Sequence, residues 1–334
     1  MNKLIVLICV LVSISSCKKD KEETKGQLPS GNGFYVVNEG NFTWANASLG
    51  FVNDSFNYSE KVFENANGKK LGDILQHFYS WGNYYYLVLN NSNKIEAIDK
   101  TTYKSIFTVK DLKNPRYMTI AGDNGYVNDL FTDEITVFDI NSGAVTNTIH
   151  LGGKTEKIYR SWAWVICNVN NKIYKIDSKA VQLTDSFDFG MKILDVATDE
   201  DSMVFAVAQG EKDSIFVLQL DKVSLKIKHK EYFSSLKAKP RYMRVTPKGA
   251  YIIKGTTLHY VEVIGNTLVA GTEIFNGMGN LYGFDVHPIT GDFYFCDAKD
   301  YASNGEVTIT DSDLNVIRKV KVGVIPNGCY FVND

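Results

Sequence analysis

The sequence contains few prolines and cysteines and almost no net charge. Only 6 of its 334 residues are proline, which suits a β-rich chain, because proline cannot donate a backbone hydrogen bond within a sheet. The formal net charge of −2 supplies no basic field for nucleic acid. The cysteines are too widely spaced for a paired-ligand metal site or a compact disulfide framework; they are Cys9, Cys17, Cys167, Cys296 and Cys329. Apolar surroundings predict buried free thiols at Cys167 and Cys296, and a Cys296–Cys329 bridge is left open.

Signatures of catalysis and of helices are also missing. The histidines show no close pair and no carboxylate at metal-ligand spacing, and the chain has neither a Gly-x-Ser-x-Gly elbow nor a glycine-rich phosphate loop. We therefore expect a protein without metal or cofactor that is not an enzyme. A carboxylate pair of Glu39 and Asp129 is the enzymatic alternative. No apolar period of 3.6 residues indicates a helix in the body of the chain.

One apolar run lies at the N-terminus. Lys3 precedes Leu4–Val12, a run too short to span a bilayer with stable flanks and typical of a secretory signal. Small residues then lead to a cysteine in Ser13–Cys17, a segment that resembles the bacterial lipobox, in which the cysteine becomes the lipidated first residue. We expect residues 1–16 to be removed and Cys17 to carry the lipid. An ordinary signal peptide is the alternative.

A charged segment, Lys18–Glu23, follows this cysteine. It cannot bury enough apolar surface to fold, so residues 17–32 should form a solvated tether. The lysine-then-acidic pattern resembles the signal that sends Bacteroidetes lipoproteins to the outer cell surface. The expected location is therefore the outer membrane, with the protein lipid-anchored and facing the cell exterior.

The rest of the chain repeats one pattern, a polar turn followed by a short alternating strand that ends on an acidic residue. Asn90–Asp99 shows the whole pattern. The strand half recurs at 48–54, 134–139, 172–177, 214–221, 257–263 and 306–311. The interval of about forty residues is the length of a four-stranded propeller blade.

The third period shows the four strands of one repeat. We expect them at 116–121, 125–130, 134–140 and 144–151, separated by turns rich in Gly and Asn, which accept positive φ angles. The first period begins at Gly33 without an innermost strand, and Ile325–Phe331 looks like the missing one. The sequence therefore predicts an all-β fold, a single seven-bladed β-propeller of four-stranded blades over residues 33–334, closed by the C-terminal strand.

Loops that lead into the innermost strands share one face of such a ring with loops that join the second and third strands. Here these loops are polar, and loops on a rigid scaffold commonly bind ligands. Arginine offers a planar fork of donors, and tyrosine offers a flat amphipathic wall. The expected ligand-binding residues are Asn38, Glu39, Trp44, Asn90, Asn91, Arg116, Tyr117, Asn128, Asp129, Arg241 and Tyr242. The alternatives are turn capping by the Asn and Asp side chains and salt bridging between blades by the arginines.

The chain, most densely from about Gly33 to Asp177, resembles YncE-like seven-bladed propellers, which are surface lipoproteins of Bacteroidetes. The segments that carry the resemblance are Tyr35–Phe42, Leu71–Asp73, Val88–Glu96, Pro115–Met118 and Asn128–Leu130. Some members of that group capture cobalamin and other corrinoids and pass them to a TonB-dependent outer-membrane transporter. The resemblance implies the same role here, with a small molecule, best a corrinoid, bound in a polar funnel and with membrane contact only through the lipid anchor. A surface propeller that binds protein or glycan is the alternative, followed by a propeller hydrolase such as a lactonase or a quinoprotein-like enzyme.

Overall fold

The computed structural model describes residues 28–199, 203–233, 242–255, 257–265, 267–276 and 279–332. The predicted leader, the predicted lipidation residue Cys17 and the predicted ligand residue Arg241 lie outside these ranges. Residues 28–32 of the predicted tether contain no helix or strand. Within the described ranges, no helix is long and apolar enough to cross a membrane.

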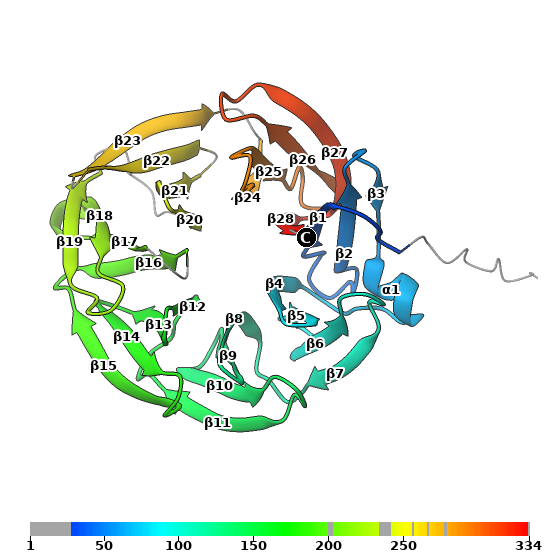
Figure 1. The fold of residues 1–334 in the computed structure, drawn as a ribbon, viewed down its shortest axis with the longest axis horizontal. Helices are drawn as coiled ribbons and strands as arrows, with labels where there is room; N and C mark the ends of the chain where they lie inside the picture. Colours follow the sequence, from blue (N-terminus) through cyan, green and yellow to red (C-terminus); the bar gives the residue numbers. More distant parts are fainter. Residues whose placement is uncertain are drawn as a thin grey trace, which may run out of the picture.

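Seven antiparallel four-stranded sheets form a ring around a central axis (Figure 1), which confirms the predicted fold class. Blade 1 contains, from the innermost strand outward, β28 (Pro326–Val332), β1 (Gly33–Asn38), β2 (Ser48–Asn53) and β3 (Tyr58–Ser59). Blade 2 contains β4 (Leu75–Trp81), β5 (Tyr84–Leu89), β6 (Lys94–Asp99) and β7 (Ser105–Val109). Blade 3 contains β8 (Pro115–Ala121), β9 (Asn124–Asp129), β10 (Glu134–Asp139) and β11 (Val145–His150).

The second half of the ring repeats this plan in the same order. Blade 4 contains β12 (Ile158–Ser161), β13 (Trp164–Val169), β14 (Lys172–Asp177) and β15 (Gln182–Asp188). Blade 5 contains β16 (Lys192–Thr198), β17 (Val204–Gln209), β18 (Ile215–Leu220) and β19 (Ile227–Tyr232). Blade 6 contains β20 (Tyr242–Thr246), β21 (Gly249–Lys254), β22 (Thr257–Ile264) and β23 (Thr267–Asn276). Blade 7 contains β24 (Leu281–Val286), β25 (Phe293–Asp297), β26 (Asn304–Thr310) and β27 (Val316–Val324).

The C-terminal strand closes the ring as the sequence predicts. β28 pairs antiparallel with β1, with Tyr35 opposite Tyr330, and the two strands lie side by side near the axis (Figure 1). This pairing covers the edge that β1 would otherwise expose, and β28 takes the innermost position of the blade. The all-β body contains two short helical elements among the described residues, α1 (Val62–Asn67) and the 3₁₀ turn η1 (Glu211–Asp213). Both are too short for a 3.6-residue period to emerge in the sequence.

The core lies between neighbouring blades and not within any one of them. Side chains alternate across each strand, so Tyr35 and Val37 of β1 pack towards blade 2, whereas Phe34 and Val36 pack towards blade 7. Seven clusters of buried apolar residues result among the described residues, one for each pair of adjacent blades. The middle strands of the blades therefore carry apolar residues on both faces, whereas outer strands such as β11 and β15 are largely exposed.

The repeated aspartate is a turn-forming residue. In Asp139, Oδ1 accepts hydrogen bonds from the backbone N–H of Asn141 (3.1 Å) and Ser142 (2.8 Å) and from the Ser142 hydroxyl (2.8 Å). Asp99 and Asp221 make the same contacts in blades 2 and 5. These donors hold the pKa of each carboxyl below its usual range. The pattern that counts the blades is therefore scaffold chemistry.

The cysteines among the described residues are buried free thiols. Cys296 of β25 and Cys329 of β28 lie with their Sγ atoms 3.8 Å apart, in contact but not bonded. Burial raises the pKa of Cys167 to about 12, so this thiol stays protonated and unreactive.

Candidate functional site

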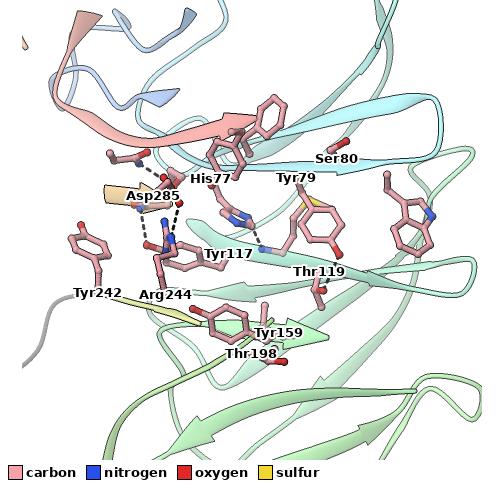
Figure 2. A pocket seen from close by; sticks show the side chains of 17 residues that line it. His77, Tyr79, Ser80, Tyr117, Thr119, Tyr159, Thr198, Tyr242, Arg244 and Asp285 are labelled. Atoms are coloured by element: carbon pink, nitrogen blue, oxygen red, sulfur yellow. Dashed lines mark hydrogen bonds and ion pairs between the residues drawn. The ribbon is translucent and has the colours of Figure 1, made fainter. Parts of the chain in front are cut away.

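Two connected cavities follow the axis of the ring. The rim cavity, of about 490 Å³, is open between the loops that follow β1, β5 and β9. The channel cavity, of about 470 Å³, lies deeper and is lined by side chains from all seven innermost strands (Figure 2). Gln76 and Tyr242 line both cavities, so the two form one funnel. The predicted face of polar loops is thus a concave surface.

A buried carboxylate, Glu39, forms the floor of the rim cavity. Its Oε1 accepts hydrogen bonds from Asn327 Nδ2 (2.9 Å) and Gln76 Nε2 (3.3 Å), and its Oε2 accepts one from the Tyr282 hydroxyl (3.0 Å). These partners lie on β28, β4 and β24, three different sheets of the ring. These three partners hold the acceptor oxygens of the carboxylate in a defined position.

Arg116 of β8 lines the same cavity and joins three blades. One guanidinium nitrogen donates to the Gln76 side-chain oxygen in blade 2, and another donates to the Glu156 carboxylate in the loop that leads into blade 4. Burial opposes the positive charge, but Glu156 outweighs it and the pKa of Arg116 is raised. Arg116 therefore forms the salt bridge between blades that the alternative expected, and it also lines the cavity, where ligand contact stays a prediction.

A second ion pair lies beneath the rim, and the sequence reasoning missed it. Lys157 Nζ lies 2.7 Å from Asp195 Oδ2, with the two side chains only 4% and 8% exposed. Burial disfavours the ammonium, yet Asp195 offsets this and the pKa of Lys157 is raised. The ammonium also lies 5.5 Å from the centre of the Tyr242 ring. The only available signal was spacing, since the two residues are 38 positions apart, about one repeat.

Exposed aromatic rings flank the rim cavity. Phe42 and Phe131 line it from blades 1 and 3, and their side chains are 66% and 61% exposed. The sequence reasoning chose neither phenylalanine. Trp44, which it did choose, is also 66% exposed but does not line the cavity. Exposed rings beside a hollow mark binding surfaces more reliably than exposed polar residues do.

Predicted polar residues position these rings. Asp73 Oδ2 accepts hydrogen bonds from Thr43 N–H (2.8 Å) and from Asn91 Nδ2 (2.6 Å), which fixes the loop bearing Phe42 and Trp44. Thr43 adopts a φ of 71°, a conformation that needs such support. In the facing loop, Asp129 Oδ1 accepts hydrogen bonds from Phe131 N–H (2.6 Å) and Thr132 N–H (2.8 Å). Asn91 and Asp129 therefore shape the rim and hold the rings in place.

The remaining predicted asparagines connect parts of the scaffold. Asn90 Nδ2 donates to the Asn114 and Pro115 carbonyls of blade 3 (3.0 Å each), and Asn128 Nδ2 donates to Thr155 O (2.7 Å) and Glu156 O (3.0 Å) before blade 4. Asn38 bonds within blade 1 to Ser48 and Tyr58 and is fully buried. These amide side chains therefore bond to neighbouring blades or across blade 1 and do not cap turns as the alternative expected, and Asn90 also lines the rim cavity.

Two of the predicted residues are tyrosines of the funnel wall. Tyr117 lines the channel cavity, and Tyr242 lines both cavities. Burial raises the pKa of Tyr117 well above its ordinary value, so its hydroxyl stays neutral. Such a wall offers flat apolar surface and hydroxyl groups together.

Metal-binding clusters of three or more His, Cys, Asp or Glu side chains do not occur in the described part of the chain. The alternative carboxylate pair is not assembled by hydrogen bonds. Glu39 is held by Gln76, Tyr282 and Asn327, whereas Asp129 accepts from its own turn. The site that the structure does assemble is a polar funnel with paired charges and aromatic edges.

Comparison with known families assigns the chain to one family. It belongs to the family described as a domain of unknown function, DUF5074, which matches residues 32–304. No curated protein matches the chain.

Solved structures that resemble the chain are propellers of several descriptions. A quinonprotein alcohol dehydrogenase-like protein from Bacteroides thetaiotaomicron is 13% identical, with a TM-score of 0.64, covering 90% of this chain and 78% of that one. A candidate 6-phosphogluconolactonase from Bacteroides fragilis is 15% identical, with a TM-score of 0.68, covering 91% and 100%. Hydrazine synthase from Kuenenia stuttgartiensis is 16% identical, with a TM-score of 0.60, covering 75% and 90%. At these identities the likeness shows the fold alone.

Proposed function

We propose that the rim cavity captures a large amphipathic small molecule with amide groups on its edge, best a corrinoid such as cobalamin. The observation that carries this proposal is the combination of exposed rings with a polar floor. Phe42 and Phe131 stand 66% and 61% exposed beside a cavity whose floor holds Glu39, Arg116 and Tyr282. A flat macrocycle with polar side groups needs both kinds of contact.

The charges of the floor favour a neutral ligand. Arg116 is already paired with Glu156, and Lys157 is paired with Asp195, so a strongly charged ligand would find its counter-ion engaged. Neutral amides can instead exchange hydrogen bonds with carboxylate oxygens and hydroxyls at a smaller desolvation cost. Each phenylalanine that becomes buried against a ring face contributes up to about 1.5–3 kcal/mol.

A corrinoid is wider than the rim cavity, so part of it would remain outside and accessible to a partner. We propose a TonB-dependent outer-membrane transporter as that partner. Trp44 lies on the same loop as Phe42, is 66% exposed and stands outside the cavity, so it is the side chain that we assign to partner contact. The lipid anchor expected at Cys17 would hold the protein on the same membrane.

Equilibrium titration of the purified protein with cobalamin and with cobinamide tests the capture. Phe131→Ala should weaken binding at least tenfold, because buried aromatic anchors dominate such interfaces. Trp162→Ala is the matched control, since Trp162 is 54% exposed in the β12–β13 turn on the opposite face. If neither cobalamin nor cobinamide binds at micromolar concentration, the corrinoid version of the proposal is excluded.

Recovery of partners from outer membranes tests the second half of the proposal. The protein should retain a transporter, and Trp44→Ala should reduce that recovery while leaving corrinoid affinity unchanged. Retention of a different protein, or of glycan, without corrinoid binding would support the interaction propeller instead. Turnover that is lost in Glu39→Gln would support an enzyme.

A further inference from the structure

The channel cavity beneath the rim has its own opening. Ser80 and Trp81 at the end of β4, and Thr198 at the end of β16, line its far end. These strand ends lie on the face opposite the rim loops, because each innermost strand starts at the rim face and runs along the axis to the other face. At the rim end, Gln76 is 5% exposed and is hydrogen-bonded to Glu39 and Arg116. A small molecule could therefore occupy the channel independently of a ligand at the rim.

A guanidinium faces this channel. Arg244 of β20 places Nε 2.7 Å from Asp285 Oδ1, and its side chain is 30% exposed against 14% for Asp285. Asp285 lines the channel as well, but both of its oxygens are engaged, because Oδ1 accepts from Arg244 Nε and Oδ2 accepts the Cys329 N–H at 2.7 Å. Gly328 packs directly against the pair, because a Cβ there would lie 3.3 Å from Asp285 Oδ2 and 3.8 Å from Arg244 Nη2. Arg244 lines the cavity beside this pair (Figure 2), so its guanidinium is the cationic group of the channel wall.

A neutral histidine supplies a second donor. His77 Nδ1 accepts the Met118 N–H at 3.3 Å, so the ring proton is assigned to Nε2. Burial, with Arg244 and Lys157 nearby, lowers the pKa of His77 to about 3. The imidazole lines the channel (Figure 2) and stays uncharged at physiological pH. It can donate through Nε2 but cannot act as a second cation.

Aromatic side chains form the channel walls. Tyr79, Tyr159 and Tyr330 enter from three different strands and line the cavity with Arg244 and His77 (Figure 2). A volume of about 470 Å³ accommodates a single ring with a short substituent. Tyrosine faces pack well against a flat ring.

We propose that the channel cavity binds a small carboxylate with a flat ring. The carboxylate accepts hydrogen bonds from the Arg244 guanidinium and His77 Nε2–H, and the ring lies among the tyrosines. Asp285 occupies the Nε edge of Arg244, and Nη1 makes a long hydrogen bond to the Met243 carbonyl oxygen (3.5 Å), so Nη2 is the guanidinium nitrogen that we assign to the ligand carboxylate. Lys157 does not compete for the ligand, because Asp195 already neutralises it. This site is separate from the proposed rim site.

Benzoate is the probe, with benzyl alcohol as its uncharged counterpart. Calorimetric titration should show saturable benzoate binding and at least tenfold weaker binding of benzyl alcohol. Benzoate should also raise the pKa of His77, measured by NMR of the imidazole, because a carboxylate beside Nε2 favours the protonated ring. Corrinoid binding at the rim should be unaffected, so failure of one site leaves the other testable.

Two variants locate the probe. Arg244→Gln alone would leave Asp285 buried without its partner, so Arg244→Gln is combined with Asp285→Asn. His77→Asn keeps an acceptor for the Met118 N–H and removes Nε2–H. Both proteins should unfold near the wild-type temperature and bind benzoate at least tenfold more weakly. Arg318→Gln is the charge control. Arg318 belongs to β27, the outer strand of blade 7, where its guanidinium lies over the Phe56 ring, so this variant removes a positive charge away from the channel. No saturable binding at concentrations on the order of 10 mM, or equal affinity in wild type and both variants, overturns the proposal.

Discussion

Replacing Lys157 by methionine removes one half of the ion pair beneath the rim cavity. Asp195, 8% exposed, would lose the ammonium that lies 2.7 Å away. Leaving one charge of a buried pair uncompensated costs about 3–5 kcal/mol. The ring extends from Gly33 to Val332, and with about 2.1 cal/mol/K of unfolding entropy per residue this loss lowers Tm by roughly 5–8 °C.

The pH dependence gives the expected sign independently of the magnitude. Burial already raises the pKa of Asp195, and loss of Lys157 should raise it further. A carboxyl whose pKa is higher in the folded state than in the unfolded state lowers the stability of the protein at pH values above its folded-state pKa. This cost disappears as the pH falls through the folded-state pKa towards the unfolded-state pKa. The deficit of Lys157→Met should therefore be smaller at about pH 5 than at about pH 7. Urea unfolding at both pH values measures it.

A second substitution decides whether the pair is the cause. Lys157→Met combined with Asp195→Leu replaces both charges by apolar groups, which is often neutral or stabilising for a buried pair. The double variant should regain most of the lost stability, giving a large coupling energy in the double-mutant cycle. A Lys157→Met deficit below about 1 kcal/mol, or additive effects of the two substitutions, would refute the reasoning.

Three further predictions concern the scaffold. The backbone N–H and hydroxyl of Ser224 hold the pKa of Asp221 at about 2. The stabilising effect of this carboxylate is therefore present above about pH 4 and lost as the pH falls towards 2. Asp221→Asn should make Tm depend less on pH in that interval, which calorimetry can measure. Gly283→Ala places a methyl group 2.1 Å from a carbonyl oxygen of β28 and should lower the free energy of unfolding by about 1–3 kcal/mol in urea, whereas Gly279→Ala, in open space, should not. Cys296 and Cys329 are buried free thiols and should resist iodoacetamide until the protein is unfolded, which peptide mass spectrometry can follow; a disulfide in protein purified without reductant would contradict this.

The repeat made the fold predictable from sequence. Most blades end their third strand on an aspartate turn, so the interval between aspartates counts the blades without any knowledge of packing. Blade 6, whose third strand ends at Ile264, lacks this aspartate. The four strands expected in the third period match β8–β11 to within one residue at each end. Helix α1 escaped because a connection of six helical residues leaves no periodic signal.

The candidate site was predictable only in part. The sequence predicted that the polar loops share one face, and Glu39, Arg116 and Tyr242 line a cavity on that face. The sequence also predicted ligand contact for Asn128, whose amide donates to carbonyls before blade 4. An asparagine in a hairpin gives the same sequence pattern whether its side chain contacts a ligand or a neighbouring carbonyl. The sequence reasoning missed Phe131, since no local pattern tells an exposed phenylalanine from a buried one.

Ion pairs along the axis follow a rule that links the repeat to the site. Arg116 and Glu156 are 40 residues apart, Lys157 and Asp195 are 38 apart, and Arg244 and Asp285 are 41 apart. In a closed ring, equivalent positions of adjacent blades become neighbours at the axis, where the dielectric is low and like charges would repel strongly. Opposite charges one period apart are therefore the arrangement that lets charged residues face the funnel. The two proposed sites differ in how their arginine is engaged. At the rim, Arg116 donates its terminal guanidinium nitrogens to Gln76 and Glu156, whereas in the channel Arg244 binds Asp285 through Nε.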